Sequence, residues 1–92
     1  APMVHRLTNA PNPFNARTEI RFELPAAGTY DLAIYDLAGR RVAAFAGLGT
    51  AGPNSVVWDG RDTQGTPVGS GSYFCRVRTG TGEATGTMML VK

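Results

Sequence analysis

Hydrophobic and polar residues alternate with a period of two along most of the chain, and short clusters of glycine and proline separate the alternating segments. In residues 18–25, TEIRFELP, the side chains of Ile20, Phe22 and Leu24 point to one side, and the Glu and Arg side chains point to the other. Such alternation is typical of β-strands that bury one face and expose the other. The same pattern recurs in residues 29–36 (TYDLAIYD), 40–47 (RRVAAFAG), 54–59 (NSVVWD), 72–77 (SYFCRV) and 87–91 (TMMLV).

This pattern predicts about seven strands once a first strand is placed at residues 3–7, MVHRL. No helix competes, because the one stretch rich in helix-forming residues, 37–47, is interrupted by glycine and too short to be stable alone. A chain of 92 residues has room for one hydrophobic core and one domain. We therefore predict an all-β fold, a single antiparallel β-sandwich over residues 11–92, with residues 1–10 as an N-terminal extension or first strand.

Two strand positions carry specific structural expectations. Val42 and Phe45 are three residues apart, so they share a face only if the strand contains a β-bulge or switches face. Trp58 lies on the apolar face of its segment, and we expect its ring to be buried between the two sheets.

Residues 9–16, NAPNPFNA, are expected to form an extended connector that places Phe14 over one end of the sandwich. Pro11 and Pro13 have no backbone N–H group, so they would deny ladder hydrogen bonds to a strand that approached this edge.

Charge and composition exclude several classes of function. Nine Lys and Arg residues against seven Asp and Glu give a net charge of +2, and the basic residues are scattered, whereas nucleic-acid binding needs them clustered. No run approaches the ~18 apolar residues of a membrane span, and the first residues lack the pattern of a secretory signal. The single cysteine, Cys75, has no partner for an intramolecular disulfide. A chain that begins at Ala1 is expected to be a processed product or a fragment.

Residues 47–52, GLGTAG, match the G-x-G-x-x-G fingerprint of dinucleotide-binding proteins through Gly47, Gly49 and Gly52. That chemistry needs a helix N-terminus directly after the glycines to bind the pyrophosphate. Pro53 and a strand-like segment follow instead, so we interpret GLGTAG as a flexible connector between strands, and we predict no cofactor.

The segment DGRDTQG resembles a calcium loop because Asp59 and Asp62 lie close together between glycines. Arg61 occupies a position where a calcium loop needs an oxygen ligand, and no Glu closes the loop. We therefore expect both carboxylates to accept backbone N–H groups in consecutive turns, with Gly60 and Gly65 at positive φ. A calcium site completed by backbone carbonyls stays open as the alternative.

The sequence contains no set of residues at the spacing that a catalytic site needs. The only histidine, His5, lies far in sequence from Cys75, and no G-x-S-x-G motif occurs. Period-two spacing places Tyr73, Cys75 and Val77 on one face, so Cys75 should be buried with a raised pKa and a poorly reactive thiol. The Tyr73 hydroxyl should donate to a backbone carbonyl. We predict that the protein is not an enzyme and has no catalytic or metal-binding residues.

Tyr35 and Phe74 fall on the strand faces opposite the core. Sandwich modules that bind sugars display aromatic rings on such a face, so these two residues form a possible surface for carbohydrate binding. Single exposed aromatic residues are also ordinary on proteins, and this leaves the hypothesis open.

Four motifs follow one another at distinctive spacing: Asn12-Pro13-Phe14-Asn15, Tyr35-Asp36-x-x-Gly39-Arg40, Trp58-Asp59-Gly60 and Gly71-x-Tyr73. Over nearly its whole length the chain resembles the immunoglobulin-like domain of flagellar hook-capping proteins. It resembles even more the related C-terminal sorting domain of type IX secretion cargo. Departures from the sorting-domain pattern are Gly86-Thr87, where a basic residue is usual, and Cys75, where an aromatic residue is more frequent.

The resemblance implies a single immunoglobulin-like (fibronectin III-like) sandwich of about seven strands. For Trp58, Asp59, Gly60 and Tyr73 it implies roles in core packing and a turn, and it implies no active site. Such domains form the last part of large exported bacterial proteins, so the expected location is secreted or at the cell surface. The expected partners are upstream domains of a parent protein and the outer-membrane export machinery.

Three hypotheses of function follow. The first is a non-catalytic C-terminal sorting and anchoring module. The second is a self-associating structural subunit of a cell-surface filament or appendage, in which an N-terminal strand loosely tied by Pro11 and Pro13 pairs with the sheet edge of another copy. The third is an accessory carbohydrate-binding module that uses Tyr35 and Phe74.

Overall fold

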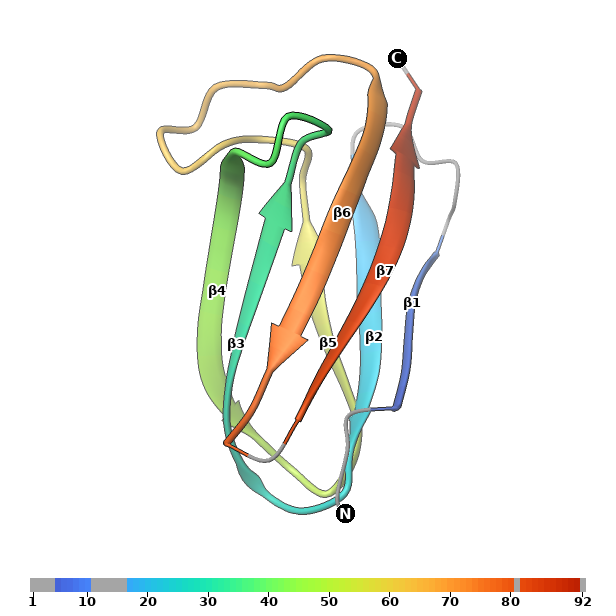
Figure 1. Ribbon diagram of the computed structural model, residues 1–92, viewed down its shortest axis with the longest axis vertical. Helices are drawn as coiled ribbons and strands as arrows, with labels where there is room; N and C mark the ends of the chain where they lie inside the picture. Colours follow the sequence, from blue (N-terminus) through green and yellow to red (C-terminus); the bar gives the residue numbers. More distant parts are fainter. Residues whose placement is uncertain (1–4, 11–16, 81, 92) are drawn as a thin grey trace.

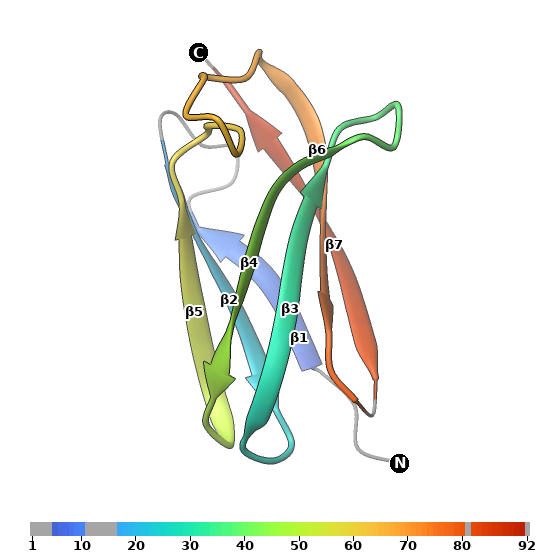
Figure 2. The same cartoon turned by 90° about the vertical axis from the view of Figure 1, so that its left-hand side faces the viewer.

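The computed structural model of the chain describes residues 5–10, 17–80 and 82–91. Seven strands form in these ranges: β1 (His5–Ala10), β2 (Thr18–Leu24), β3 (Gly28–Tyr35), β4 (Arg41–Gly49), β5 (Gly52–Trp58), β6 (Gly71–Arg78) and β7 (Glu83–Leu90). They make two antiparallel sheets, one in the order β1-β2-β5 and the other in the order β4-β3-β6-β7. The sheets lie against each other as two layers (Figures 1 and 2). This confirms the predicted all-β immunoglobulin-like sandwich.

The core is built by the alternating residues that the sequence pattern placed on inner faces. Each of the following side chains is at most 7% exposed: Ile20, Phe22, Leu24, Leu32, Ile34, Ala43, Trp58, Tyr73, Cys75, Val77, Met88 and Leu90. They form one contiguous cluster between the two sheets. The Phe22 ring meets Tyr30 edge-on, and the Trp58 ring meets Tyr73 in the same way, so aromatic pairs connect the layers at two points.

The first and last strands differ most from the expected segments. The first strand continues past the expected end at residue 7 to residue 10, while residues 3 and 4 of the expected strand lie outside the described residues. The last strand begins at Glu83, four residues before the expected start at residue 87. The early part of β7 was missed because glycine and small residues weaken the strand signal there. The connector at residues 11–16, with Asn12, Pro13 and Phe14, lies outside the described residues, and the proposed division of the chain at residue 10 stays a prediction.

A register shift at the start of β4 confirms the expected bulge. Ile34 pairs with Ala43 and Tyr35 pairs with Arg41, so Val42 is the extra residue in β4. Both Val42 and Phe45 pack against the core as a result.

The interpretation of GLGTAG as a flexible connector was wrong for its first half, because Gly47 and Gly49 lie inside β4. A Cβ atom on Gly47 would lie 2.9 Å from the Tyr30 hydroxyl oxygen, and one on Gly49 would lie 2.5 Å from Leu24 Cδ1. These glycines let the strand approach the core closely. Only the turn before Gly52, held by hydrogen bonds between Thr50 and Asn54, is a connector.

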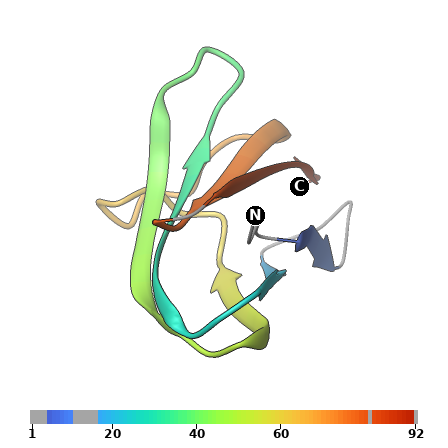
Figure 3. The same ribbon diagram turned by 60° about the horizontal axis from the view of Figure 1, so that its bottom comes forward.

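The two lateral sides of the sandwich differ. On one side β1 approaches β7 so closely that a Cβ atom on Gly86 would lie 3.2 Å from the Leu7 carbonyl oxygen. On the other side β4 and β5 belong to different sheets and do not pair with each other. Figures 1 and 3 accordingly place β1 at one margin of the molecule and β4 at the other. The described residues contain no helix of the length and apolarity that a membrane crossing requires.

Candidate functional site

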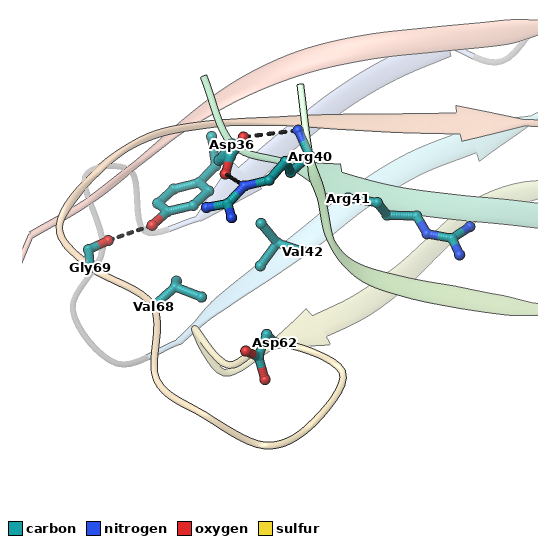
Figure 4. Close-up of a pocket in the computed structure, with 8 residues that line it drawn as sticks. Asp36, Arg40, Arg41, Val42, Asp62, Val68 and Gly69 are labelled. Carbon is teal, nitrogen blue, oxygen red and sulfur yellow. Dashed lines mark hydrogen bonds and ion pairs between the residues drawn. The ribbon is translucent and has the colours of Figure 1, made fainter. Parts of the chain in front are cut away.

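The motif residues that the structure describes gather at one end of the sandwich, where β3 and β5 end and where β4 and β6 begin. Figure 4 shows part of this end, with the Asp36 turn and the loop that follows β5 side by side. These motifs are far apart in the sequence, and the order of the strands in the two sheets brings them together.

Asp36 organises the turn between β3 and β4. Its carboxylate accepts the backbone N–H of Ala38 at 3.0 Å and that of Arg40 at 2.9 Å, and the Arg40 Nε at 3.0 Å. Gly39 has φ +86°, which a residue with a side chain rarely adopts, and its N–H donates to the Asp36 carbonyl. The backbone N–H of Arg40 is the main reason that the pKa of Asp36 lies below its ordinary value of 3.8. The ionised carboxylate therefore holds the turn closed at neutral pH.

The loop after β5 is tied in a similar way by its two aspartates. Asp62 Oδ1 accepts the backbone N–H groups of Gln64 and Thr66, each at 2.9 Å, and Asp59 Oδ1 accepts that of Arg61 at 3.2 Å. Both glycines of the segment, residues 60 and 65, have positive φ, as expected. The carboxylates thus serve the consecutive turns that the sequence predicted. Among the described residues, no group of three or more His, Cys, Asp and Glu side chains is arranged to hold a metal ion.

Further hydrogen bonds join this loop to the rest of the domain. The Trp58 Nε1–H group donates to the Arg61 carbonyl at 2.9 Å, and the Thr63 N–H donates to the Val42 carbonyl of β4 at 3.1 Å. The loop is therefore anchored to both sheets, because β4 and β5 lie in different layers.

Tyr73 closes the same end from β6. Its hydroxyl donates to the Gly69 carbonyl, and its ring meets Trp58 at 5.4 Å between centroids and at 70°. Burial, and secondarily the negative charge of Asp36, raises the pKa of Tyr73. Burial also raises the pKa of Cys75, two residues further along β6, to about 12. These findings confirm the predicted backbone hydrogen bond of Tyr73 and the predicted burial and raised pKa of Cys75, whose poor reactivity stays a prediction.

A hollow of about 340 Å³ lies between the Asp36 turn and the loop (Figure 4). It is lined by Asp36, Arg40, Arg41, Val42, Asp62, Val68, Gly69 and Tyr73. The two carboxylates and the Tyr73 hydroxyl all take part in hydrogen bonds that hold the loops, so the chemistry of this hollow is structural. Val42 and Val68 were not predicted here, because only the bulge in β4 and the hydrogen bond from the Val68 N–H to the Gly60 carbonyl bring them to this end.

A second candidate site lies on the outer face of the four-stranded sheet. Tyr35 of β3 and Phe74 of β6 are directly opposite each other in the ladder, and both are half-buried. Arg76 donates from Nη2 to the Tyr35 hydroxyl at 3.1 Å, and its guanidinium carbon lies 5.4 Å from the centroid of that ring. Leu37 is 69% exposed. Together with Tyr35, Phe74 and Arg76 it lines a second hollow, of about 290 Å³. We call Tyr35, Leu37, Phe74 and Arg76 the outer patch.

Sequence reasoning found the two rings of the outer patch but missed its other members. Arg76 follows Phe74 at a spacing of two on β6, which was a readable signal for the same face. Leu37 lies in a turn, where period-two spacing gives no direction. Gly71 begins β6, while Asn12, Pro13 and Phe14 lie outside the described residues.

Comparison with known proteins places this architecture in a family. The family model described as the FlgD Ig-like domain matches residues 8–83. No curated protein sequence matches the chain.

Among solved structures, the chain is similar to dimeric latent PorU from Porphyromonas gingivalis, with a TM-score of 0.73, 23% identity, and coverage of 92% of this chain and 9% of PorU. It is also similar to PorZ, a bacterial surface component of the type IX secretion system of P. gingivalis, with a TM-score of 0.66, 20% identity, and coverage of 94% and 11%. FlgD from P. aeruginosa gives a TM-score of 0.66 and 26% identity over 79% of this chain and 58% of FlgD.

The chain thus spans a small part of PorU and PorZ and little more than half of FlgD. Because the family model covers most of the sequence, and the fold agrees with that of FlgD over 79% of the chain, the chain belongs to the family of FlgD immunoglobulin-like domains.

Proposed function

We propose that this domain is a non-catalytic C-terminal sorting and anchoring module of an exported bacterial protein. The observation that carries this role is the membership of the FlgD immunoglobulin-like family together with a fold that forms only a small part of PorU and PorZ. PorZ is a surface component of the type IX secretion system, so this fold occurs in that setting. The parent protein would carry its own activity in upstream domains and leave recognition by the outer-membrane export machinery to this one.

The outer patch is the surface on which we expect the export machinery to bind. Two aromatic rings and an arginine beside an exposed leucine have the composition of energetic centres in protein interfaces. The Arg76 guanidinium already packs on the Tyr35 ring, which limits the side-chain entropy lost on binding. The hydrogen-bonded end of the sandwich supports the patch, because Asp36 directly follows Tyr35 and fixes the end of β3.

A secretion assay tests this role. The chain is fused to the C-terminus of a periplasmic reporter and expressed in a bacterium that has a type IX secretion system, and reporter activity is measured on the cell surface and in the medium. We expect export of the wild-type fusion and loss of export for the Tyr35→Ala/Phe74→Ala double variant. Val57→Ala is the matched control, because Val57 is a 52% exposed apolar residue of the other sheet. Retention of the wild-type reporter in the periplasm would overturn the sorting role.

Carbohydrate binding is the second candidate, and the cross-strand pairing of Tyr35 with Phe74 favours it. Calorimetric titration with a panel of soluble polysaccharides separates the two functions. Binding heat that disappears in the same double variant would support a sugar site, and its absence for the wild-type domain would exclude one for that panel.

A further inference from the structure

β4 is an edge strand whose residues after the bulge at Val42 include few of the obstacles that usually protect sheet edges. It spans nine residues, and from Val42 to Gly49 it contains neither a charged residue nor a proline. Exposed edges ordinarily carry lysine, proline or other obstacles to pairing with another chain. By comparison, β5 carries Pro53 near its start, and β7 is approached by Leu7 of β1.

The backbone groups of β4 show which residues are available for pairing. The Val42 carbonyl points away from β3, since it accepts the Thr63 N–H from the loop after β5. The register with β3 is regular from Ala43 to Gly49, beyond the bulge. Alternate residues of a regular strand direct their N–H and C=O groups to the same side, so Ala44, Ala46 and Leu48 present theirs to the free edge. Within the described ranges, no other strand or loop segment makes a backbone hydrogen bond with these three residues on that side.

The side chains of the same residues favour an identical partner. Ala44 and Ala46 are small and exposed, and Leu48 is 79% exposed. If two copies pair antiparallel about a two-fold axis at Ala46, Ala44 of each copy lies opposite Leu48 of the other. That register would cover Leu48 and would meet no bulky or charged side chain. It would also place Arg41 of each copy opposite Ala51 of the other, so the two Arg41 side chains lie on the order of 30 Å apart and do not repel.

We propose that β4 is a strand-pairing site for a second copy of this chain. The resulting two-fold dimer joins the two four-stranded sheets into one continuous sheet, with Ala46 at its centre. This arrangement differs from a filament built by the N-terminal strand, because a two-fold pair closes on itself. It is independent of the sorting role, since the outer patch lies over β3 and β6 and stays accessible.

Sedimentation analysis of the 92-residue chain over a concentration series tests the dimer. We expect the wild-type mass to rise from monomer to dimer, and Ala46→Lys to weaken dimerisation by about tenfold or more, because it sets like charges directly opposite each other. Thr85→Lys is the matched control, since Thr85 is exposed on β7 at the other margin of the same sheet. Ala46→Pro is a second variant, which removes the outward-pointing N–H donor of residue 46 without adding a charge, and it should weaken dimerisation too. Circular dichroism verifies that each variant is folded.

Oxidative cross-linking tests the register. Residues opposite each other in a hydrogen-bonded pair have Cα atoms about 5.5 Å apart, within the range of a disulfide. Ala46→Cys should therefore form a covalent dimer quickly, and Thr85→Cys should not, while buried Cys75 does not compete. A wild-type chain that stays monomeric at all concentrations overturns the dimer, even if it binds extended peptides of other proteins. An Ala46→Lys variant that associates as strongly as wild type overturns it as well.

Discussion

Trp58 connects the two sheets to the loop that follows β5. Its indole packs against Tyr73 of the opposite sheet, and its Nε1–H group holds the Arg61 carbonyl of the loop. Asp36 has the corresponding role in the β3–β4 turn. In both cases a side chain of the motif makes hydrogen bonds with backbone groups of a loop that would otherwise have no partner.

Replacing Trp58 with alanine should lower the free energy of unfolding by about 3–5 kcal/mol, because a large side chain that is 1% exposed is removed from the core. Trp58→Phe is the control that retains an aromatic ring but loses the hydrogen bond, and it should cost less. Urea denaturation followed by circular dichroism measures both variants. A loss below about 1 kcal/mol for the alanine variant would contradict burial of the ring.

Asp36 should make the stability of the domain depend on acid. Because its pKa in the folded state is lowered, its contribution is present above the ordinary value of 3.8 and is lost as the pH falls through the folded-state value. The Asp36→Asn variant should therefore lose less stability than wild type between about pH 5 and pH 2. Unfolding midpoints measured at a series of pH values would show this, and parallel curves for the two proteins would argue against it.

At the scale of single elements, β4 departs most from a regular strand. A bulge at Val42 brings two apolar residues spaced by three onto the core, and two glycines near its end let it approach Tyr30 and Leu24. The glycines that resemble a nucleotide-binding motif are therefore packing residues.

Gly49→Ala should destabilise the domain by about 1–3 kcal/mol, because its Cβ atom would lie 2.5 Å from Leu24 Cδ1 in a filled core. Gly47→Ala should cost less, because the approach is less close, at 2.9 Å, and the Tyr30 side chain that it meets is only partly buried and can move. Gly28→Ala is the control, since its Cβ atom would meet no atom within 4 Å. Thermal unfolding ranks the three variants, and equal melting temperatures for Gly49→Ala and Gly28→Ala would contradict the close approach.

At the scale of the whole molecule, the two lateral sides of the sandwich differ in how closely the sheets approach each other. β1 pairs with β2 and contacts β7 without pairing with it, whereas β4 and β5 do not approach each other in this way. The outer edge of β4 is therefore the place where a further strand can be added.

Removing residues 1–10 should lower the unfolding temperature and increase aggregation, because it deletes β1, uncovers the edge of β2 and removes the contact of Leu7 with Gly86 of β7. Thermal denaturation with light scattering measures both effects. If the truncated chain were as stable and as soluble as the full chain, the segment would be an extension that contributes nothing to the sandwich.

The sequence alone determined the local features of this protein. Side chains alternate between the two faces of a strand, so the alternation of apolar residues predicted the core faces of β2, β3 and β6 and the bulge in β4. The glycines beside Asp59 and Asp62 predicted the turns that these two residues stabilise. The roles of Trp58, Tyr73 and Cys75 followed from the same alternation.

Only the tertiary structure decided which distant segments meet. Nothing local specifies that Gly47 faces Tyr30, that Arg76 packs on Tyr35, or that Gly86 adjoins Leu7. Such contacts depend on how strands far apart in the chain are ordered in the sheets, and the long-range packing of the core sets that order. For the same reason the sequence does not show that β4 lies at an edge of its sheet, and only the strand order shows it.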